Sequence, residues 1–130
     1  MKNIGLIGCG NIAETYFRSQ DYFNNIKFVA CADKFPEASK KCADQYGIQS
    51  LNVDEILFDS NIDIILNLTI PQAHYEVSKQ ALEAGKHVYS EKPMSIKFEE
   101  AKELLQIAKK NNLYIGNAPD TFLGGGSQTA

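Results

Sequence analysis

A glycine-rich motif directly after the first apolar run limits the fold of this chain more than any other feature. The apolar run covers residues 3–7, and the motif that follows it is Gly8-Cys9-Gly10-Asn11-Ile12-Ala13. This is the pattern G-x-G-x-x-A, which is typical of a buried parallel strand that turns tightly into a helix. The sequence therefore predicts a strand, a sharp turn and a helix at the start of the chain.

The small residues of this motif each have a physical role. Gly8 permits the tight turn, Gly10 leaves out the side chain where a pyrophosphate approaches the backbone, and Ala13 lets the helix pack close to the strand. The helix, with Asn11 as a candidate N-cap, directs free N–H groups and the positive end of its dipole at the phosphates. Glycines at strand ends also occur in plain turns, but this context favours a dinucleotide site that includes residues 8–12.

Strands and helices alternate along the chain. Apolar runs and helical periodicity predict helices at residues 11–20, 36–46, 53–58, 72–84 and 96–111 and strands at residues 3–7, 26–32, 48–51, 62–69, 87–90 and 113–116. Short connections between alternating elements require right-handed crossovers, which give a parallel sheet with helices on both faces. We therefore expect an α/β domain, a doubly wound Rossmann-type sheet, with its ligand beyond the carboxyl ends of the strands.

An acidic residue ends the second predicted strand. Asp33 follows the motif by about 20 residues, the distance at which a carboxylate accepts hydrogen bonds from the adenosine ribose of a dinucleotide. The alternative is that Asp33 caps the next helix, a common role for aspartate. A carboxylate here repels a 2′-phosphate and favours NAD over NADP, whereas the neighbouring Lys34 offers an ammonium that can pair with that phosphate.

Two further groups of polar residues follow later strands. The first is Thr69-Ile70-Pro71 with His74, and the second is Ser90-Glu91-Lys92-Pro93. Because parallel strands end at one edge of a sheet, we expect both groups beside the glycine turn. On spacing alone, the plainer interpretation is that Pro71 starts a helix, that His74 is a surface residue of its first turn, and that Lys92 is solvated.

Charge and composition exclude several classes of partner. The formal net charge is −3 with acids and bases interspersed, so the chain has no basic stripe for a nucleic acid backbone. No stretch approaches the ~20 apolar residues of a membrane span. Met1 and Lys2 lead straight into the first apolar run without a cleavage-site pattern. These features indicate a cytoplasmic protein with no nucleic acid or membrane partner.

The cysteines favour a reduced compartment. Cys9, Cys31 and Cys42 form an odd set without C-x-x-C spacing, which argues against a disulfide framework and against a structural zinc site. The two histidines are too isolated to change that interpretation. We therefore expect no metal, and we interpret the cysteines as small packing residues.

These motifs together resemble the glucose-fructose oxidoreductase and inositol dehydrogenase family, also called Gfo/Idh/MocA. The resemblance covers nearly the whole chain and rests on Gly8-Cys9-Gly10-Asn11-Ile12-Ala13, Asp33, Thr69-Ile70-Pro71 with His74, and Ala84-Gly85-Lys86-His87-Val88 leading into Glu91-Lys92-Pro93. The glycine motif is shared by many families. A strand that enters Glu-Lys-Pro at this spacing is much more specific.

The resemblance implies a catalytic role for Lys92, which would hydrogen-bond the nicotinamide ribose and polarise a substrate hydroxyl. Glu91 and the turn from Pro71 to His74 would help to hold the cofactor. It also implies NAD(P)-dependent hydride transfer on a sugar, cyclitol or related hydroxyl compound. An NAD(H)-binding sensor without catalysis is the alternative. We further expect a bend at Lys92–Pro93, for which a cis peptide bond is one compact solution.

The family also carries a second domain, which supplies substrate contacts and commonly the oligomer interface. We therefore interpret residues 1–120 as an NAD(P)-binding domain and the glycine-rich, polar residues 121–130 as a flexible tail leading to a missing C-terminal domain. The full-length enzyme is expected to act on a small molecule and to form a homo-oligomer. One departure is that residues 117–122 lack the arginine of an Arg-aromatic pair often found there.

Overall fold

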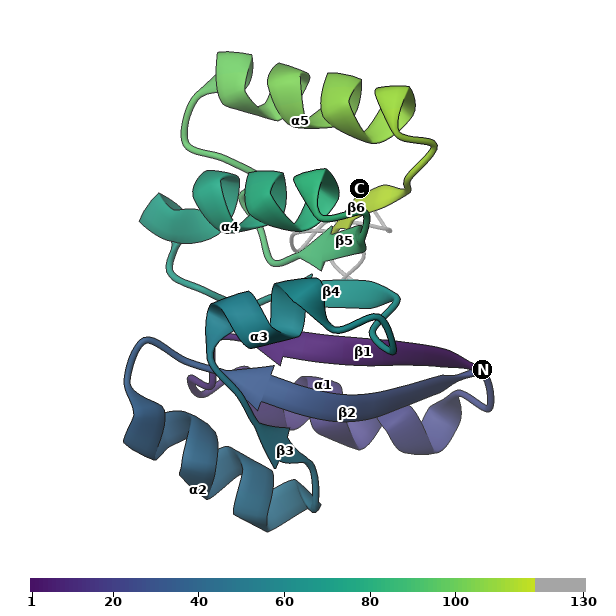
Figure 1. Ribbon diagram of the computed structural model, residues 1–130. Helices are drawn as coiled ribbons and strands as arrows, with labels where there is room; N and C mark the ends of the chain where they lie inside the picture. The colour runs from purple at the N-terminus through teal and green to yellow at the C-terminus, as the bar shows by residue number, and fades with distance from the viewer. Residues whose placement is uncertain (119–130) are drawn as a thin grey trace, which may run out of the picture.

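The computed structural model describes residues 1–118, which form a parallel sheet flanked by helices (Figure 1). The strands are β1 (Lys2–Ile7), β2 (Ile26–Ala32), β3 (Gln49–Ser50), β4 (Ile64–Asn67), β5 (His87–Ser90) and β6 (Ile115–Asn117). The helices are α1 (Ala13–Ser19), α2 (Pro36–Tyr46), α3 (Val53–Phe58), α4 (Pro71–Glu83) and α5 (Phe98–Lys110), with a 3-10 turn η1 (Gln20–Tyr22) after α1. The strand order β3-β2-β1-β4-β5-β6 is that of a Rossmann fold and confirms the predicted fold class.

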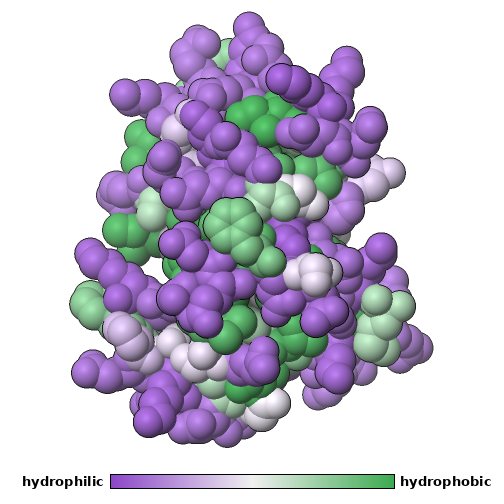
Figure 2. Space-filling model, viewed as in Figure 1, coloured by the Kyte–Doolittle hydropathy of each residue, from purple (hydrophilic) through white to green (hydrophobic). Residues whose placement is uncertain are grey.

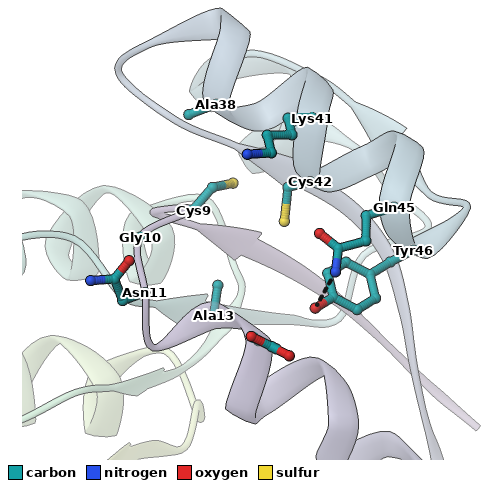
Figure 3. A pocket seen from close by; sticks show the side chains of 10 residues that line it. Cys9, Gly10, Asn11, Ala13, Ala38, Lys41, Cys42, Gln45 and Tyr46 are labelled. Carbon is teal, nitrogen blue, oxygen red and sulfur yellow. Dashed lines mark hydrogen bonds between the residues drawn. The ribbon is translucent and has the colours of Figure 1, made fainter.

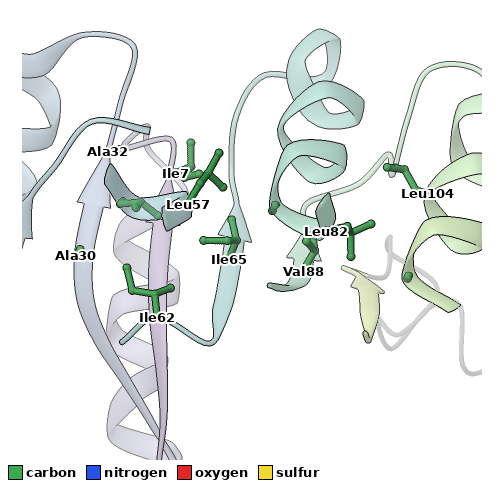
Figure 4. Close-up of a cluster of buried hydrophobic side chains, with 12 residues drawn as sticks. Ile7, Ala30, Ala32, Leu57, Ile62, Ile65, Leu82, Val88 and Leu104 are labelled. Carbon is green, nitrogen blue, oxygen red and sulfur yellow. The ribbon is translucent and has the colours of Figure 1, made fainter. Parts of the chain in front are cut away.

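Neighbouring residues of β1 point into two separate hydrophobic cores. Leu6 belongs to one core with Phe17 of α1 and Ala43 of α2. Ile7 belongs to the other core, to which α3, α4 and α5 also contribute (Figure 4). Helices therefore cover both faces of the sheet, as Figure 1 shows. A strand that is buried on both faces needs a continuous apolar sequence. Residues 30–32 of β2 fit this requirement, because they are all small, apolar and fully buried.

The face that carries α3, α4 and α5 is the one seen in Figures 1 and 2. Hydrophilic side chains cover most of it, and hydrophobic residues show in separate areas between them. Within residues 1–118, no helix is both long enough and apolar enough to cross a membrane. A mixture of hydrophilic and hydrophobic residues of this kind is ordinary for the surface of a folded domain.

Several predicted boundaries differ from the structure by a few residues. Helix α1 begins at Ala13, and Ile12 occupies the N-cap position without a side-chain cap bond, so the prediction of Asn11 as the cap was wrong. The turn is longer than expected because the Ala13 N–H donates to the Gly10 carbonyl. β4 ends at Asn67 rather than at residue 69. The proposed tail at residues 121–130 lies outside the described part of the chain.

The strand order fixes where a ligand can enter. From β1 the chain proceeds toward β2 and β3, whereas from β4 it proceeds toward β5 and β6 on the opposite side. The connections after β1 and β4 therefore separate at the carboxyl ends of these two neighbouring strands. In open α/β sheets this switch point is where a crevice forms and ligands bind.

Candidate functional site

The fold itself requires a glycine at position 8. Gly8 has a φ of +105°, and a Cβ built on it would lie 2.6 Å from the carbonyl carbon and oxygen of Leu68. The Leu68 N–H in turn donates to the Ile7 carbonyl at 2.8 Å. The turn after β1 and the turn after β4 are therefore in direct backbone contact, which forms the floor of the crevice.

No such requirement exists at Gly10. A Cβ on Gly10 would meet no atom within 4 Å, and its φ is not among the positive values found in the structure. Neither sterics nor backbone conformation explains the glycine. The empty space beside it is consistent with the predicted close approach of a phosphate to the backbone.

A cavity of about 590 Å³ opens beside this turn (Figure 3). It lies between the glycine turn with the start of α1 and the part of α2 that contains Ala38, Cys42 and Tyr46. Its lining residues are Cys9, Gly10, Asn11, Ala13, Glu14, Ala38, Lys41, Cys42, Gln45 and Tyr46. The cavity thus includes part of the predicted dinucleotide motif.

Asp33 connects the ends of β1 and β2. One carboxylate oxygen accepts the Cys9 N–H at 2.7 Å, and the other accepts the Phe35 N–H at 2.9 Å. Asp33 is not the N-cap of α2, because Phe35 occupies that position. Asp33 lies two residues before Phe35, and its carboxylate holds the backbone at the point where the chain enters α2. An ionised carboxylate has about four acceptor positions, so Asp33 retains capacity for ribose hydroxyls.

Three exposed apolar side chains surround the crevice. Ile12 is 42% exposed, Phe35 is 62% exposed and Ile70 is 66% exposed. Each follows the carboxyl end of a different strand. The Lys34 ammonium lies 5.8 Å from the centre of the Phe35 ring. Exposed aromatic and aliphatic groups beside polar acceptors are typical of sites that bury the rings of a ligand.

The end of β4 contains a buried polar network that the sequence analysis did not identify. The fully buried Asn67 donates its amide to the Ser78 hydroxyl at 2.9 Å and to the His74 carbonyl at 3.0 Å. Its side-chain oxygen accepts the Thr69 hydroxyl at 2.6 Å. A polar Asn inside an apolar strand was the available signal, since buried amides need several partners.

His74 lies inside the protein, with 1% of its surface exposed, so the plainer interpretation of it as a surface residue was wrong. Its Nε2 lies 2.6 Å from the Thr69 carbonyl oxygen, and its Nδ1 lies 2.5 Å from that of Pro93. The ring therefore joins the turn after β4 to the turn after β5. The Lys92–Pro93 peptide bond is cis, as the sequence analysis anticipated.

Glu91 and Lys92 follow β5 at the same edge. The Glu91 N–H donates to the Asn67 carbonyl at 3.1 Å, and the Glu91 carboxylate accepts the Tyr16 hydroxyl at 2.5 Å. Burial and this hydrogen bond raise the pKa of Tyr16, which therefore remains a donor. Lys92 is exposed. Asn117 of β6 supports the turn from the other side by donating to the Ser90 hydroxyl at 3.0 Å.

The structure thus collects the predicted residues at the carboxyl edges of β1, β2, β4 and β5. Gly8, Cys9 and Asp33 are in contact on one side, and Thr69, His74 and Glu91 are joined through Asn67 and Pro93 on the other. The contact between Gly8 and Leu68 connects the two sides. Tyr16, Phe35, Asn67 and Asn117 are the additional residues at this edge that sequence patterns did not single out.

Comparison with known proteins agrees with this geometry. Residues 2–118 match the model of the Gfo/Idh/MocA oxidoreductase family, described as having an NAD-binding Rossmann fold. The chain belongs to this family. Its described residues are the NAD-binding domain, and the resemblance stated on sequence motifs is confirmed.

The relatives include enzymes of different substrate classes. Inositol 2-dehydrogenase of Rhizobium meliloti is 28% identical over 114 residues, 86% of this chain and 34% of that protein. Biliverdin reductase of Synechocystis, solved with biliverdin and NADP⁺, is 27% identical with a TM-score of 0.90, over 97% of this chain and 40% of that one. The WlbA dehydrogenase of Chromobacterium violaceum, solved with NADH and UDP-GlcNAcA, is 25% identical with a TM-score of 0.90, over 98% of this chain and 38% of that one. The chain therefore spans between 34% and 40% of these relatives.

The buried position of His74 leads to a stability prediction. His74→Ala should lower the free energy of unfolding by about 2–4 kcal/mol, because it leaves a cavity and removes a polar link between two turns. Urea denaturation followed by circular dichroism measures this loss. His87→Ala is the matched control, since His87 is half-buried and should cost less. Equal losses in the two variants would contradict the bridging role of His74.

Proposed function

We propose that this domain holds NAD for hydride transfer between the nicotinamide and a hydroxyl carbon of a sugar, cyclitol or related compound. The observation that carries the proposal is Gly10, a glycine at the crevice that no contact within the chain requires. Membership of an oxidoreductase family and an inositol dehydrogenase among its relatives support the reaction class. In this proposal, NAD supplies the hydride chemistry and the protein supplies binding and orientation.

The residues of the crevice have distinct roles in this proposal. Gly8 and Gly10 let the backbone of residues 8–12 approach the pyrophosphate, and Asp33 accepts the hydroxyls of the adenosine ribose. Ile12 and Ile70 cover the apolar faces of the cofactor. The turn after β4 lies behind the cofactor and contributes Thr69, Pro71 and His74. These contacts position the cofactor but do not change its oxidation state.

Lys92 is the proposed catalytic residue. Its ammonium donates a hydrogen bond to the substrate oxygen and stabilises the negative charge that develops there as the hydroxyl proton leaves. Glu91, held by Tyr16 and by the end of β4, sets the direction in which the chain leaves β5. The proton acceptor, the substrate contacts and the homo-oligomer interface are proposed to come from a second domain, as the resemblance to the family implies.

An NAD(H)-dependent sensor without catalysis is the second candidate. It would use the same glycine turn and Asp33, because both functions need the cofactor. Lys92 distinguishes the two candidates, since a sensor has no need of an ammonium at the reacting hydroxyl. We favour the enzyme because Lys92 stands directly after β5 at the same edge as the other proposed cofactor contacts.

Calorimetry with the 130-residue chain tests the proposal at its first step. We expect NAD to bind with weak to moderate affinity, because the glycine turn and Asp33 are present while a covering second domain is not. A rise in melting temperature with NAD concentration should accompany the heat of binding. If millimolar NAD produces neither heat nor a shift in melting temperature, the cofactor site as proposed does not exist.

Asp33→Ala should shift the cofactor preference from NAD toward NADP. Loss of the carboxylate removes charge-assisted hydrogen bonds to the ribose, worth about 1.5–3 kcal/mol, and removes repulsion of a 2′-phosphate. The NAD to NADP affinity ratio should therefore fall by about tenfold or more. Titration of each variant with both cofactors measures this ratio.

Two further variants separate binding from structural support. Asp33→Asn retains an acceptor for the Cys9 or Phe35 N–H but lacks the negative charge, so the ratio should again fall. Asp44→Ala removes an exposed carboxylate from α2 and should leave the ratio unchanged. If Asp33→Ala weakens NAD and NADP equally, Asp33 only supports the backbone.

A further inference from the structure

The three cysteines of the chain, distant in sequence, meet beneath the glycine turn. Cys9 belongs to the turn after β1, Cys31 to β2 and Cys42 to α2. Their three sulfur atoms all lie within 4.8 Å of one another. Figure 3 shows the Cys9 and Cys42 side chains directed into the space between the turn and α2.

The fold explains why sequence spacing could not predict this cluster. Ile7 pairs with Ala32, so the turn after β1 lies beside the end of β2. Cys31 faces the same core as Ala43 and Cys42, which lie on the buried side of α2. The absence of C-x-x-C spacing counts against a zinc site within one short segment, but it does not apply to ligands that come from three separate elements.

The cluster is buried but has an opening. Cys31 is 0% exposed and Cys42 is 9% exposed, whereas Cys9 is half-buried. The Cys31 thiol donates to the Ser39 carbonyl at 3.3 Å, and the Cys9 thiol donates to the Ala32 carbonyl at 3.6 Å. Cys9 and Cys42 also line the cavity of about 590 Å³, which gives an ion from solvent a path to the sulfur atoms.

The protonation of the cluster is uneven. Hydrogen bonding from Cys9 lowers the pKa of Cys31, whereas hydrogen bonding to Cys31 and burial raise the pKa of Cys9. Burial also raises the pKa of Cys42 to about 11. A metal ion that binds here therefore has to displace thiol protons.

We propose that Cys9, Cys31 and Cys42 bind a soft metal ion of the zinc type through three sulfur ligands, with the fourth position facing the cavity. Zinc–sulfur bonds of about 2.3 Å in tetrahedral geometry place the sulfur atoms about 3.8 Å apart. The observed separations require movements of about 1 Å or less to reach that spacing. As each sulfur–metal bond forms, the thiol proton passes to the solvent.

A disulfide would use only two of the three sulfur atoms. Three thiolate ligands, by contrast, match the ligand type that zinc and copper(I) prefer. The metal site does not depend on the proposed cofactor function, because Cys9 would meet NAD through its backbone and the metal through its sulfur atom, whereas Cys31 and Cys42 are not among the proposed cofactor contacts. Failure to bind NAD and failure to bind metal are therefore separate results.

Cobalt(II), a spectroscopic substitute for zinc, provides the test. The reduced, metal-free 130-residue chain is titrated with Co²⁺ under nitrogen, followed by Zn²⁺. We expect thiolate-to-cobalt charge-transfer absorption that saturates at one ion per chain and disappears as zinc displaces cobalt. Cys31→Ala and Cys42→Ala should each weaken zinc binding by about 100-fold or more, since each removes a direct ligand.

Two controls keep the result interpretable. His87→Gln removes the half-buried histidine outside the cluster and should bind zinc as the unsubstituted chain does. Circular dichroism shows whether each cysteine variant folds. If a variant does not fold, the unsubstituted chain is used instead, and zinc should protect its three thiols from reaction with a maleimide. Three results would overturn the proposal. They are cobalt binding without charge-transfer bands, full zinc affinity in Cys42→Ala, and formation of a disulfide in place of metal binding.

Discussion

Gly10→Ala is expected to weaken NAD binding by about tenfold or more while leaving the domain as stable as before. The added methyl group meets no protein atom within 4 Å, and the backbone at Gly10 is not in the left-handed region. Removal of a glycine from such a position can even stabilise a protein by about 0.4–1 kcal/mol, through the unfolded state. The methyl group would instead occupy the space in which we propose that the pyrophosphate approaches the backbone.

Gly8→Ala is the matched comparison for this prediction. It should lower the free energy of unfolding by more than about 2 kcal/mol, because the new Cβ clashes with the Leu68 backbone at a positive φ. Urea denaturation and NAD calorimetry on both variants measure the two effects. Unimpaired NAD binding by Gly10→Ala would show that Gly10 does not contact the cofactor.

Lys92→Ala should lower turnover by about 10²–10⁴-fold in the proposed full-length enzyme. NAD affinity should change little, because the proposed role of the ammonium is at the reacting hydroxyl and the adenosine end of the site is untouched. Steady-state kinetics and NAD titration separate these two quantities.

Lys97→Ala is the control for the lysine prediction. Lys97 is also exposed and lies at the start of α5, so its loss should leave turnover nearly unchanged. A fall in NAD affinity as large as the fall in turnover would make Lys92 a cofactor-binding residue only. Unchanged turnover in Lys92→Ala would instead favour the sensor.

Local patterns were enough to predict most of this fold. The alternation of strands and helices follows from hydrophobic periodicity, and each turn is set by a few neighbouring residues. The predicted strand at residues 26–32 and the helices at 36–46 and 53–58 have the bounds that the structure gives. Asn11 is one exception, because the turn continues past it before α1 begins, and the early end of β4 is another.

Contacts between distant residues account for what the sequence did not predict. His74 is buried because it lies against Pro93, 19 residues further along the chain, and no local pattern contains that information. The cysteine cluster likewise requires the pairing of β1 with β2 and the packing of α2. Asp33 lies at the carboxyl end of β2, as its place in the sequence predicted, but its bond to Cys9 depends on the pairing of β1 with β2.

The link that His74 makes between two turns has a consequence for conformational entropy. Asn67, Ser78 and His74 are all buried, and within residues 1–118 no buried side-chain nitrogen or oxygen lacks a hydrogen-bond partner. The turns after β4 and β5 are therefore ordered by the protein itself before any ligand arrives. A ligand that binds against these two turns does not have to order them. Less of its interaction energy is then lost to conformational entropy, and more of it appears as affinity.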